Sequence, residues 1–220
     1  MKVNEIFASI EGEGSRAGYP SVFIRLHGCN LRCSYCDSMY AVSGDDFKEM
    51  KICEILAEVK KYNIPRITLT GGEPLIHENV LELIRELTTN YSVNIETNGA
   101  VDLTPFVKDA AKHNYRCNLM FTMDWKSLSS NMHTKMIQDN VSLLSSNDVL
   151  KFVVGSPRDL KQAEHIVKYL HPGCQVFISP IFGQIEPKQI VEYMLVTGMN
   201  ECRVQLQLHK FIWPPETKGV

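Results

Sequence analysis

Three cysteines lie close together in the stretch HGCNLRCSYCDS, with the spacing Cys29-x3-Cys33-x2-Cys36. Thiolates bind zinc and iron–sulfur clusters, and both kinds of site usually take four protein ligands. No second cysteine pair is present to complete a zinc site. Three thiolates on a four-iron cluster leave one iron open to a ligand from outside the protein, and the spacing favours that chemistry. The remaining cysteines are scattered, and we expect them to be small buried hydrophobic side chains: Cys53, Cys117, Cys174 and Cys202.

Further polar and glycine motifs follow short apolar runs of the chain. Gly71-Gly72-Glu73-Pro74 comes directly after RITLT. Glycine lets backbone groups approach a ligand closely, although a plain strand-to-helix turn ending at Pro74 is the alternative. Side chains at the ends of later runs are also candidates for binding: Glu96, Asp124, Trp125, Lys126 and Ser179. For Asp124 and Lys126 the alternative is an exposed ion pair.

The elements that must position these residues alternate between strands and helices. Apolar runs predict seven strands, at residues 21–26, 66–70, 92–97, 117–124, 148–154, 175–180 and 202–208. Helical periodicity lies between them, at residues 52–62, 81–87 and 160–170. This alternation predicts an α/β fold with right-handed crossovers and a mostly parallel sheet of six or seven strands. That number is too small for a closed eight-fold barrel, so we expect a partial, open (β/α) barrel with its chemistry at the C-terminal ends of the strands.

The composition is typical of a globular protein. The chain has 220 residues, of which 44% are hydrophobic, and a formal net charge of −2, so we expect residues 1–220 to form a single domain. The near-neutral charge argues against nucleic-acid binding, and no apolar run is long enough to span a membrane. The acidic N-terminal stretch does not resemble a signal peptide. We therefore expect a cytoplasmic protein, in which disulfides do not explain seven cysteines.

The cysteine spacing, with Tyr35 before the third cysteine, resembles the signature of the radical S-adenosylmethionine (SAM) superfamily. Gly71-Gly72-Glu73 resembles that superfamily's element for the SAM amino group. The resemblance implies a 4Fe–4S cluster on Cys29, Cys33 and Cys36, with SAM bound to the open iron and cleaved on reduction to a 5′-deoxyadenosyl radical. It implies these cofactor-binding residues: Tyr35, Gly71, Gly72, Glu73, Glu96, Asp124, Trp125, Lys126 and Ser179.

Four smaller elements narrow the resemblance: Ile10-Glu11-Gly12-Glu13-Gly14, Arg25 within an apolar run, Asp37-Ser38, and Gln207-Leu208-His209-Lys210 at the end of the last predicted strand. Together they resemble the 7-carboxy-7-deazaguanine synthase family of queuosine (7-deazapurine) biosynthesis, over the whole chain. Two departures stand out. Glu11 occupies a position where the family commonly has Gln, and Asp124-Trp125-Lys126 stands where relatives have Ser-Pro-Lys.

This resemblance implies conversion of 6-carboxy-5,6,7,8-tetrahydropterin to 7-carboxy-7-deazaguanine with loss of ammonia, with SAM regenerated and Mg2+ assisting. We expect Arg25, which is costly to bury unpaired, to bind the substrate carboxylate through its planar guanidinium. Glu13 and His209 are expected to contact the pterin edge and, with Arg25, to be the catalytic residues. Thr70 is expected to donate to the substrate. The other expected substrate contacts are Ile10, Glu11, Gly12 and the carboxylate of Val220.

Ser38 is the expected Mg2+ ligand, because it offers a hard oxygen beside the third cysteine. Each of these assignments has a simpler alternative. Glu13 as a solvated loop acid, His209 as a strand-end histidine and Ser38 as a helix cap all fit the same sequence. The apolar residues near the end, Phe211, Ile212 and Trp213, are expected to pack on the barrel.

Two other functions share the cysteine spacing. One is a glycyl-radical activating enzyme that acts on a protein partner, against which the Glu-Gly-Glu-Gly element and His209 argue. The other is a metal-binding module without catalytic activity. For the pterin enzyme, the expected partners are a flavodoxin- or ferredoxin-type electron donor and a second copy of the chain in a homodimer.

Overall fold

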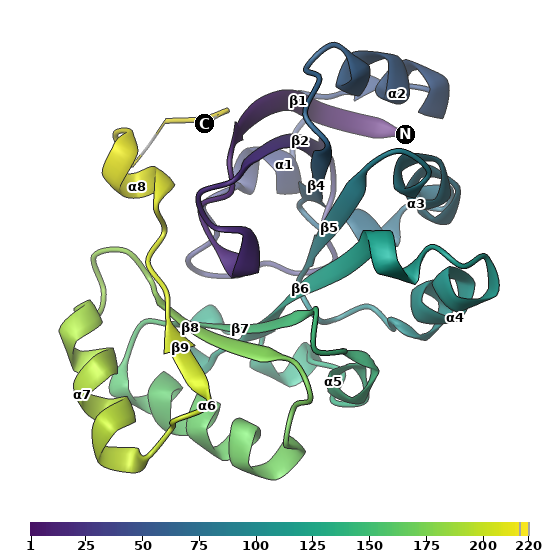
Figure 1. The fold of residues 1–220 in the computed structure, drawn as a ribbon. Coiled ribbons are helices and arrows are strands. Elements are labelled where there is room, and N and C mark those ends of the chain that lie inside the picture. Colours follow the sequence, from purple (N-terminus) through teal and green to yellow (C-terminus); the bar gives the residue numbers. More distant parts are fainter. Residues whose placement is uncertain (216, 220) are drawn as a thin grey trace.

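The computed structural model describes residues 1–215 and 217–219, and its nine strands form one curved sheet in the order β3-β1-β2-β4-β5-β6-β7-β8-β9 (Figure 1). The two edge strands do not pair with each other, so the barrel is open as predicted. The strands are β1 (Lys2–Ile10), β2 (Pro20–Leu26), β3 (Lys48–Glu49), β4 (Arg66–Gly71), β5 (Ser92–Thr97), β6 (Leu119–Lys126), β7 (Val149–Val154), β8 (Gln175–Pro180) and β9 (Cys202–Val204).

The seven parallel strands, β2 and β4 to β9, are those that the apolar runs predicted. The sequence analysis missed β1 and β3, which extend the sheet in antiparallel fashion beyond β2. In β1, polar Asn4 and Glu5 interrupt the apolar pattern, and β3 is only two residues long. The fold class was therefore predicted correctly, with an antiparallel extension that the sequence did not reveal.

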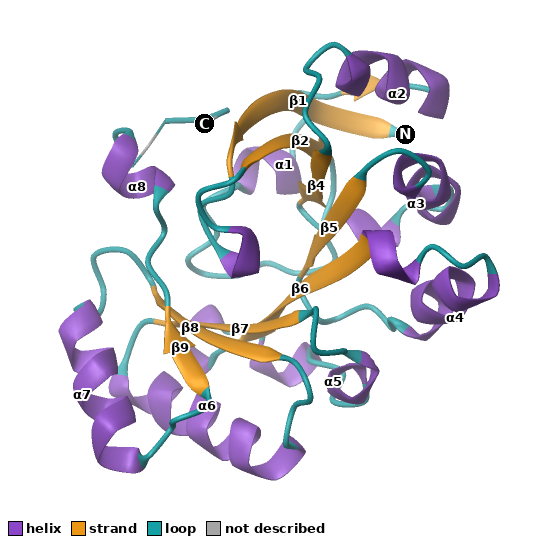
Figure 2. Ribbon diagram, viewed as in Figure 1, coloured by secondary structure: helices purple, strands orange, loops and turns teal. Residues whose placement is uncertain are grey.

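Helices cover the outer, convex side of the sheet (Figure 2). The α-helices are α1 (Met39–Val42), α2 (Ile52–Lys60), α3 (Val80–Thr88), α4 (Thr104–Lys112), α5 (Asn140–Leu143), α6 (Pro157–Leu170), α7 (Pro187–Thr197) and α8 (His209–Ile212). The 3-10 helices are η1 (Gly14–Arg16), η2 (Pro74–Ile76), η3 (Arg116–Asn118), η4 (Leu128–Ser130) and η5 (His133–Lys135). The three helices predicted from periodicity correspond to α2, α3 and α6.

The two faces of the sheet differ in chemistry. In β2, Val22, Ile24 and Leu26 point toward the helices and are fully buried in the main hydrophobic core, while Phe23 and Arg25 point to the inner side. Polar side chains gather on the inner side of the following strands: Thr68, Thr70, Asn94, Glu96, Thr122, Asp124, Lys126, Lys151 and Ser179. Burying so many polar groups is costly unless they bind one another or a ligand, so the inner face is the candidate functional surface.

Several predicted positions are corrected by the structure. Strand β9 ends at Val204, because the side chain of Gln205 bonds both the N–H and the C=O of Gly14 and draws the chain away from the sheet. His209 therefore begins α8 instead of ending a strand. Phe211 and Ile212 are 66% and 56% exposed, so the prediction that they pack on the barrel was wrong. The prediction that the scattered cysteines are all buried holds only for Cys202, since Cys53 and Cys117 are exposed and Cys174 is half-buried.

No helix among the described residues is both long and apolar enough to cross a membrane.

Glu11 is a carboxyl buried inside the barrel, with 1% of its surface exposed. The Thr68 hydroxyl donates to it, and Thr68 in turn bonds Ser21. Burial and the nearby Glu96 raise the pKa of Glu11 from 4.5 to about 7, although the Thr68 bond acts in the opposite direction. The folded state thus keeps a proton that the unfolded chain loses above pH 4.5. This contribution to stability is complete below pH 4.5 and is lost as the pH rises through 7.

We therefore predict that Glu11→Gln stabilises the protein at pH 8 relative to the parent chain, by about 1–3 kcal/mol. The amide cannot ionise, so the gain should shrink toward zero at pH 5. Urea unfolding of both proteins at pH 5, 6, 7 and 8 measures the difference. A difference in unfolding free energy that does not change with pH would contradict this assignment.

Candidate active site

The cysteine loop, residues 27–38, joins β2 to α1 and carries three half-buried free thiols. Its ends are held by backbone bonds from Gly28 to Ala41 and from Ser34 to Ser130. The Asn98 amide donates to the Cys29 sulfur at 3.6 Å. Burial raises the pKa of the Cys33 and Cys36 thiols, while the nearby cation of Lys126 favours their thiolate forms.

These thiols suit a multi-iron cluster better than a single ion. Among residues 1–215 and 217–219, no three His, Cys, Asp or Glu side chains converge on a point that would hold one metal ion. A zinc site requires such convergence, whereas an iron–sulfur cluster takes its thiolates on separate iron atoms. Cys29, Cys33 and Cys36 together with the Lys126 cation therefore fit the 4Fe–4S group that the spacing indicated.

The Gly71-Gly72 turn lies directly against the cysteine loop. Gly72 donates to Leu26 at 3.1 Å and Glu73 donates to Gly28 at 2.9 Å. A Cβ atom on Gly71, whose φ is +153°, would lie 2.1 Å from the Leu26 carbonyl, and one on Gly72 would lie 2.3 Å from that of Gly28. The glycines are thus needed here for close approach of two protein backbones, whereas the sequence had suggested approach to a ligand.

The side chain of Glu73 is fully buried and joins two strand ends. Its carboxylate accepts hydrogen bonds from the Thr97 hydroxyl at 2.9 Å, the Asn98 N–H at 2.6 Å and the Leu75 N–H at 3.0 Å. Burial raises the pKa of Glu73 to about 7, although these three bonds oppose the shift. In this structure Glu73 therefore fixes the ends of β4 and β5 beside the cysteine loop.

A row of alternating charges crosses the inner face of the sheet. Lys151, in β7, lies 3.1 Å from an oxygen of Glu13 and 3.1 Å from one of Asp124. The other oxygen of Asp124 binds Lys126 at 2.7 Å. Burial raises the pKa of Asp124, but the two lysines outweigh this and hold it below its usual value. The row runs from the loop after β1 to the neighbourhood of Cys33.

Lys151 is a site residue that sequence reasoning missed. Burial lowers its pKa, but Asp124 and Glu13 more than compensate and raise the pKa well above the ordinary lysine value. Its signal was present in the sequence, because Lys151 is the single charge inside the apolar run VLKFVV. The same signal drew attention to Arg25.

The buried polar atoms that have no partner among the described residues include two on the inner face at predicted site residues, Oε1 of Glu13 and Oγ of Ser179. Glu96 lies nearby and accepts a hydrogen bond from Thr70. Burial raises the pKa of Glu96 above its usual value, although the Lys151 cation acts in the opposite direction. Since buried polar atoms are rarely left unpaired, Glu13 and Ser179 are positions where a ligand would complete the hydrogen bonding.

Arg25 is held by residues from two other elements. Its Nε donates to Glu5 at 2.7 Å, and the Tyr40 hydroxyl donates to the same carboxylate oxygen at 2.6 Å. The two Nη groups of Arg25 have no hydrogen-bond partner in the part of the chain that the structure describes. Glu5 thus orients the guanidinium and leaves its outer edge available for another carboxylate.

The glycine loop, residues 11–14, packs against the segment that follows β9. A Cβ atom on Gly12 would lie 2.0 Å from Nδ1 of His209, so the histidine ring rests on this glycine. Leu208 donates to the Gly12 carbonyl at 3.0 Å, and the Gln207 amide donates to Glu13 at 3.3 Å. Burial lowers the pKa of His209. Glu13 and His209, almost two hundred residues apart in sequence, are therefore neighbours.

Comparison with known proteins agrees with this arrangement. Residues 23–172 match the model of the radical SAM superfamily. A protein of Clostridium acetobutylicum named 7-carboxy-7-deazaguanine synthase is 42% identical, with the match covering 100% of this chain and 99% of the relative. A protein of Halobacterium salinarum with the same name is 43% identical over 98% of this chain and 88% of its own. This chain belongs to the 7-carboxy-7-deazaguanine synthase family.

A solved structure titled QueE from Escherichia coli shares the fold of this family member. It superposes with a TM-score of 0.72 at 22% identity and covers 94% of this chain and 93% of its own. The family resemblance and the fold class inferred from the sequence are thereby confirmed.

Some residues expected to line the site of this family member lie elsewhere. The side chain of Trp125 points to the helix side of β6, is 4% exposed and packs with Phe152 in the hydrophobic core. It is therefore not placed to bind a cofactor, because alternate strand residues face opposite sides. Ser38 stands at the start of α1 without capping it and donates to Asp37 at 3.0 Å. Ile10 is half-buried at the end of β1, beside Pro20 of β2. Val220 lies outside the described residues.

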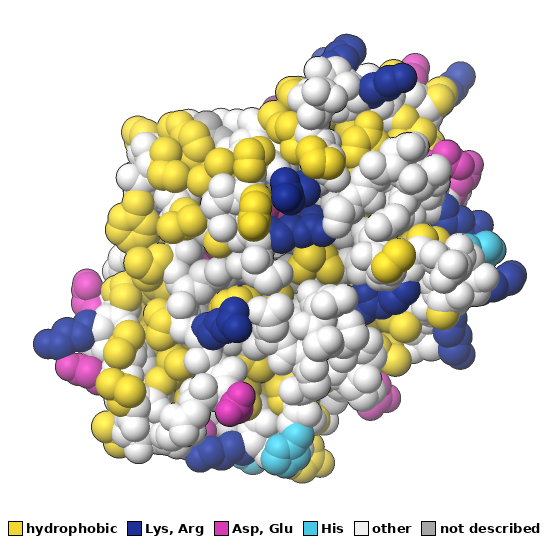
Figure 3. Space-filling model, viewed as in Figure 1, with side chains coloured by type: hydrophobic (Ala, Val, Ile, Leu, Met, Phe, Trp, Pro, Cys, Tyr) yellow, Lys and Arg dark blue, Asp and Glu magenta, His cyan; other side chains and the backbone are white. Residues whose placement is uncertain are grey.

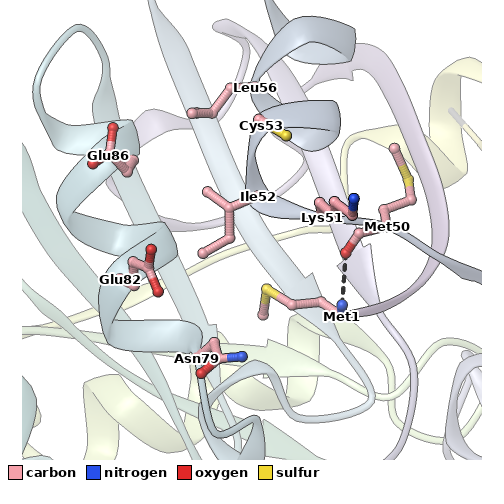
Figure 4. Close-up of a pocket in the computed structure, with 9 residues that line it drawn as sticks. All are labelled: Met1, Met50, Lys51, Ile52, Cys53, Leu56, Asn79, Glu82 and Glu86. Atoms are coloured by element: carbon pink, nitrogen blue, oxygen red, sulfur yellow. Dashed lines mark hydrogen bonds between the residues drawn. The ribbon is translucent and has the colours of Figure 1, made fainter.

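A separate cavity of about 530 Å³ lies between α2 and α3, away from the inner face of the sheet (Figure 4). The N-terminal amine of Met1 bonds the Met50 carbonyl there at 2.6 Å. The cavity is lined by Met1, Met50, Lys51, Ile52, Cys53, Leu56, Asn79, Glu82 and Glu86. None of the candidate site residues lines this cavity, so the candidate active site is the inner face of the sheet.

Proposed function

We propose that this protein converts 6-carboxy-5,6,7,8-tetrahydropterin to 7-carboxy-7-deazaguanine with release of ammonia. The observation that carries the proposal is that the inner face presents both a hydrogen-bond acceptor and a pair of hydrogen-bond donors to a ligand. Glu13 Oε1 and the two Nη groups of Arg25 have no hydrogen-bond partner among the described residues, so Glu13 can accept from a pterin N–H and Arg25 can donate to the substrate carboxylate. The shared name of the full-length relatives supports the same substrate and favours it over a glycyl-radical partner.

The protein's own residues bind and orient the reactants. Cys29, Cys33 and Cys36 would hold the cluster, which with SAM supplies the radical that removes a hydrogen atom from the substrate. Asp124 and Lys126, an ion pair near Cys33, would bind SAM. The remaining proposed SAM contacts are Tyr35, Gly71, Gly72, Glu73, Glu96 and Ser179.

On the substrate side, Arg25 would fix the carboxylate and Glu13 the edge of the pterin ring. His209 is held against Gly12, and burial favours its neutral form, which can both donate and accept a hydrogen bond. Thr70 and the backbone of the glycine loop would complete the substrate contacts. The inner-face position of these groups, away from bulk water, strengthens their electrostatic interactions with substrate.

Anaerobic incubation of the reconstituted protein with SAM, a reductant, Mg2+ and the carboxytetrahydropterin tests this function. Mass spectrometry should detect 7-carboxy-7-deazaguanine and ammonia with SAM recovered. Cleavage of SAM to 5′-deoxyadenosine without formation of the deazapurine product would contradict the proposal.

We further propose that Mg2+ binds beside the cysteine loop through Ser38. The supporting observation is the hydrogen-bonded pair of half-buried Ser38 and exposed Asp37, which presents hydroxyl and carboxylate oxygens directly after Cys36. Mg2+ keeps several water ligands and is commonly bound by one or two protein groups plus substrate oxygens. A site with so few protein ligands would therefore form fully only with substrate present.

Ser38→Ala should raise the Mg2+ concentration needed for half-maximal turnover, by about tenfold if one direct ligand is lost. SAM binding, measured by equilibrium dialysis without reductant, should stay within about twofold of the parent value, because Ser38 is not one of the proposed SAM contacts. Ser142→Ala, which removes an exposed hydroxyl in α5 outside the cysteine loop, is the matched control. An unchanged Mg2+ requirement in Ser38→Ala would remove this residue from the site.

Three further proposals concern the surroundings of the enzyme. A flavodoxin- or ferredoxin-type donor would reach the cluster at the cysteine loop, where Asn30, Arg32 and Ser34 are exposed. A homodimer is supported by hydrophobic side chains gathered over α7 and α8 (Figure 3), among them Leu195 and Phe211, which are 77% and 66% exposed. A cytoplasmic location is supported by the need of the cluster for reduced thiols.

A further inference from the structure

Lys151 is the cation at the centre of the charged row, and no described residue other than Glu13 and Asp124 pairs with it. It projects from the middle of β7, between the loop that carries Glu13 and the strand that carries Asp124. Its side chain is 8% exposed. The two carboxylates that it bridges belong to the two halves of the proposed site.

The bridge engages the two carboxylates to different extents. Glu13 uses Oε2 for Lys151, and its Oε1 is buried and unpaired. Asp124 uses Oδ1 for Lys151 and Oδ2 for Lys126. Any ligand that fixes Asp124 and Lys126 therefore fixes Lys151, and through Lys151 it orders the Glu13 carboxylate.

Ordering of this kind couples two binding events. A ligand pays an entropic cost when it immobilises long side chains, and a lysine side chain has several rotatable bonds. Lys151 is already paired with both carboxylates, so the residual motion that the first ligand removes from this unit no longer has to be removed when the second ligand binds. The coupling is reciprocal, because the free energy does not depend on which ligand binds first.

We propose that Lys151 is a positioning residue that couples SAM binding to pterin binding, by holding Asp124 of the SAM side and Glu13 of the pterin side in one salt-bridged unit. This inference rests on the proposed function, because it takes the two ligands from that reaction. It assigns Lys151 no contact with either ligand. Its consequence is that radical formation is favoured when the substrate is present, since each ligand tightens the binding of the other.

The test is the ratio of the SAM dissociation constants measured without and with saturating pterin, on cluster-loaded protein in the presence of Mg2+ and without reductant. Equilibrium dialysis under anaerobic conditions gives both constants without turnover. In the parent protein we expect SAM to bind at least about fivefold more tightly when pterin is present. In Lys151→Met the ratio should fall to near one, and Lys151→Arg, which keeps a cation able to bridge two carboxylates, should restore most of it.

Arg116→Met is the matched control. Arg116 pairs with the fully buried Asp148 just before β7, so its loss also leaves a buried carboxylate without its cation, but at the opposite end of the strand. Its ratio should equal that of the parent protein. If Lys151→Met fails to fold, Glu13→Gln and Asp124→Asn weaken the same bridge from its two ends, and each should lower the ratio.

A parent protein with a ratio of one, or Lys151 variants that keep the parent ratio, would overturn the inference. An equal loss of ratio in Arg116→Met would do so as well, because it would show a general effect of lost stability. Pterin turnover by the parent protein is measured separately. Its absence contradicts the proposed function, whereas turnover with an unchanged ratio contradicts only the coupling by Lys151.

Discussion

Replacing Cys33 with alanine should abolish both the iron–sulfur cluster and pterin turnover. Cys33 lies at the centre of the cysteine loop, half-buried and close enough to Lys126 for the cation to favour its thiolate. With only two thiolates left, the loop offers too few ligands to hold a four-iron cluster. We expect loss of the brown colour, of bound iron and sulfide, and of the paramagnetic signal of the reduced protein, with turnover below detection. Cys29→Ala and Cys36→Ala should behave in the same way.

Cys53→Ala and Cys174→Ala are the matched controls, because they remove a thiol without touching the loop. Cys53 is exposed beside the cavity between α2 and α3, and Cys174 is half-buried just before β8. Both variants should bind the parent amount of iron and sulfide. A complete cluster in Cys33→Ala, or loss of the cluster in Cys53→Ala, would place the iron ligands elsewhere in the chain.

The parallel part of the fold was predictable because each central strand is buried on both faces near its N-terminal end. The segments at residues 66–71, 92–97 and 175–180 are short apolar runs bounded by turns, and all three were found within one residue of their structural limits. Strand β1 was missed for a physical reason. It lies toward the sheet edge and is mostly half-exposed, so its sequence lacks a continuous apolar run.

The site was predictable where spacing along the chain reflects chemistry. The cysteine loop and the Gly71-Gly72-Glu73 element are local motifs, so the sequence showed them directly. The partners of these elements come from distant segments and were not visible. Neither the bond from Gln205 to Gly14 nor the contact of Lys151 with Glu13 follows from any local pattern. Such contacts depend on how distant segments meet at the inner face, which only the structure reveals.

Trp125 illustrates the opposite error. It was grouped with Asp124 and Lys126 because the three are adjacent, yet strand geometry sends neighbouring side chains to opposite faces. Asp124 and Lys126 therefore reach the inner face, and Trp125 packs in the core. The alternation rule, applied to a predicted strand ending at Lys126, would have separated them.

The second prediction with a large effect concerns Arg25. Glu5 and Tyr40 orient its guanidinium from behind, and its Nη groups have no partner in the described part of the chain. A half-buried arginine with an open edge of this kind suits bidentate binding of a carboxylate, and the proposed pterin carries one. Removing one partner of such a pair costs about 2–5 kcal/mol. Arg25→Met should therefore lower kcat/KM for the pterin roughly thirtyfold or more, mainly through KM.

The cluster content and the SAM dissociation constant without pterin should stay near the parent values in Arg25→Met, because Arg25 contacts neither the cysteines nor Asp124. Glu5→Gln is the graded control. It keeps the hydrogen bond to Nε but removes the charge behind the guanidinium, so it should raise KM by a smaller factor than Arg25→Met. A pterin analogue lacking the carboxylate separates binding from general damage. Arg25→Met and the parent protein should bind that analogue equally well, and a large difference between them would show that Arg25 acts on the fold instead of on the carboxylate.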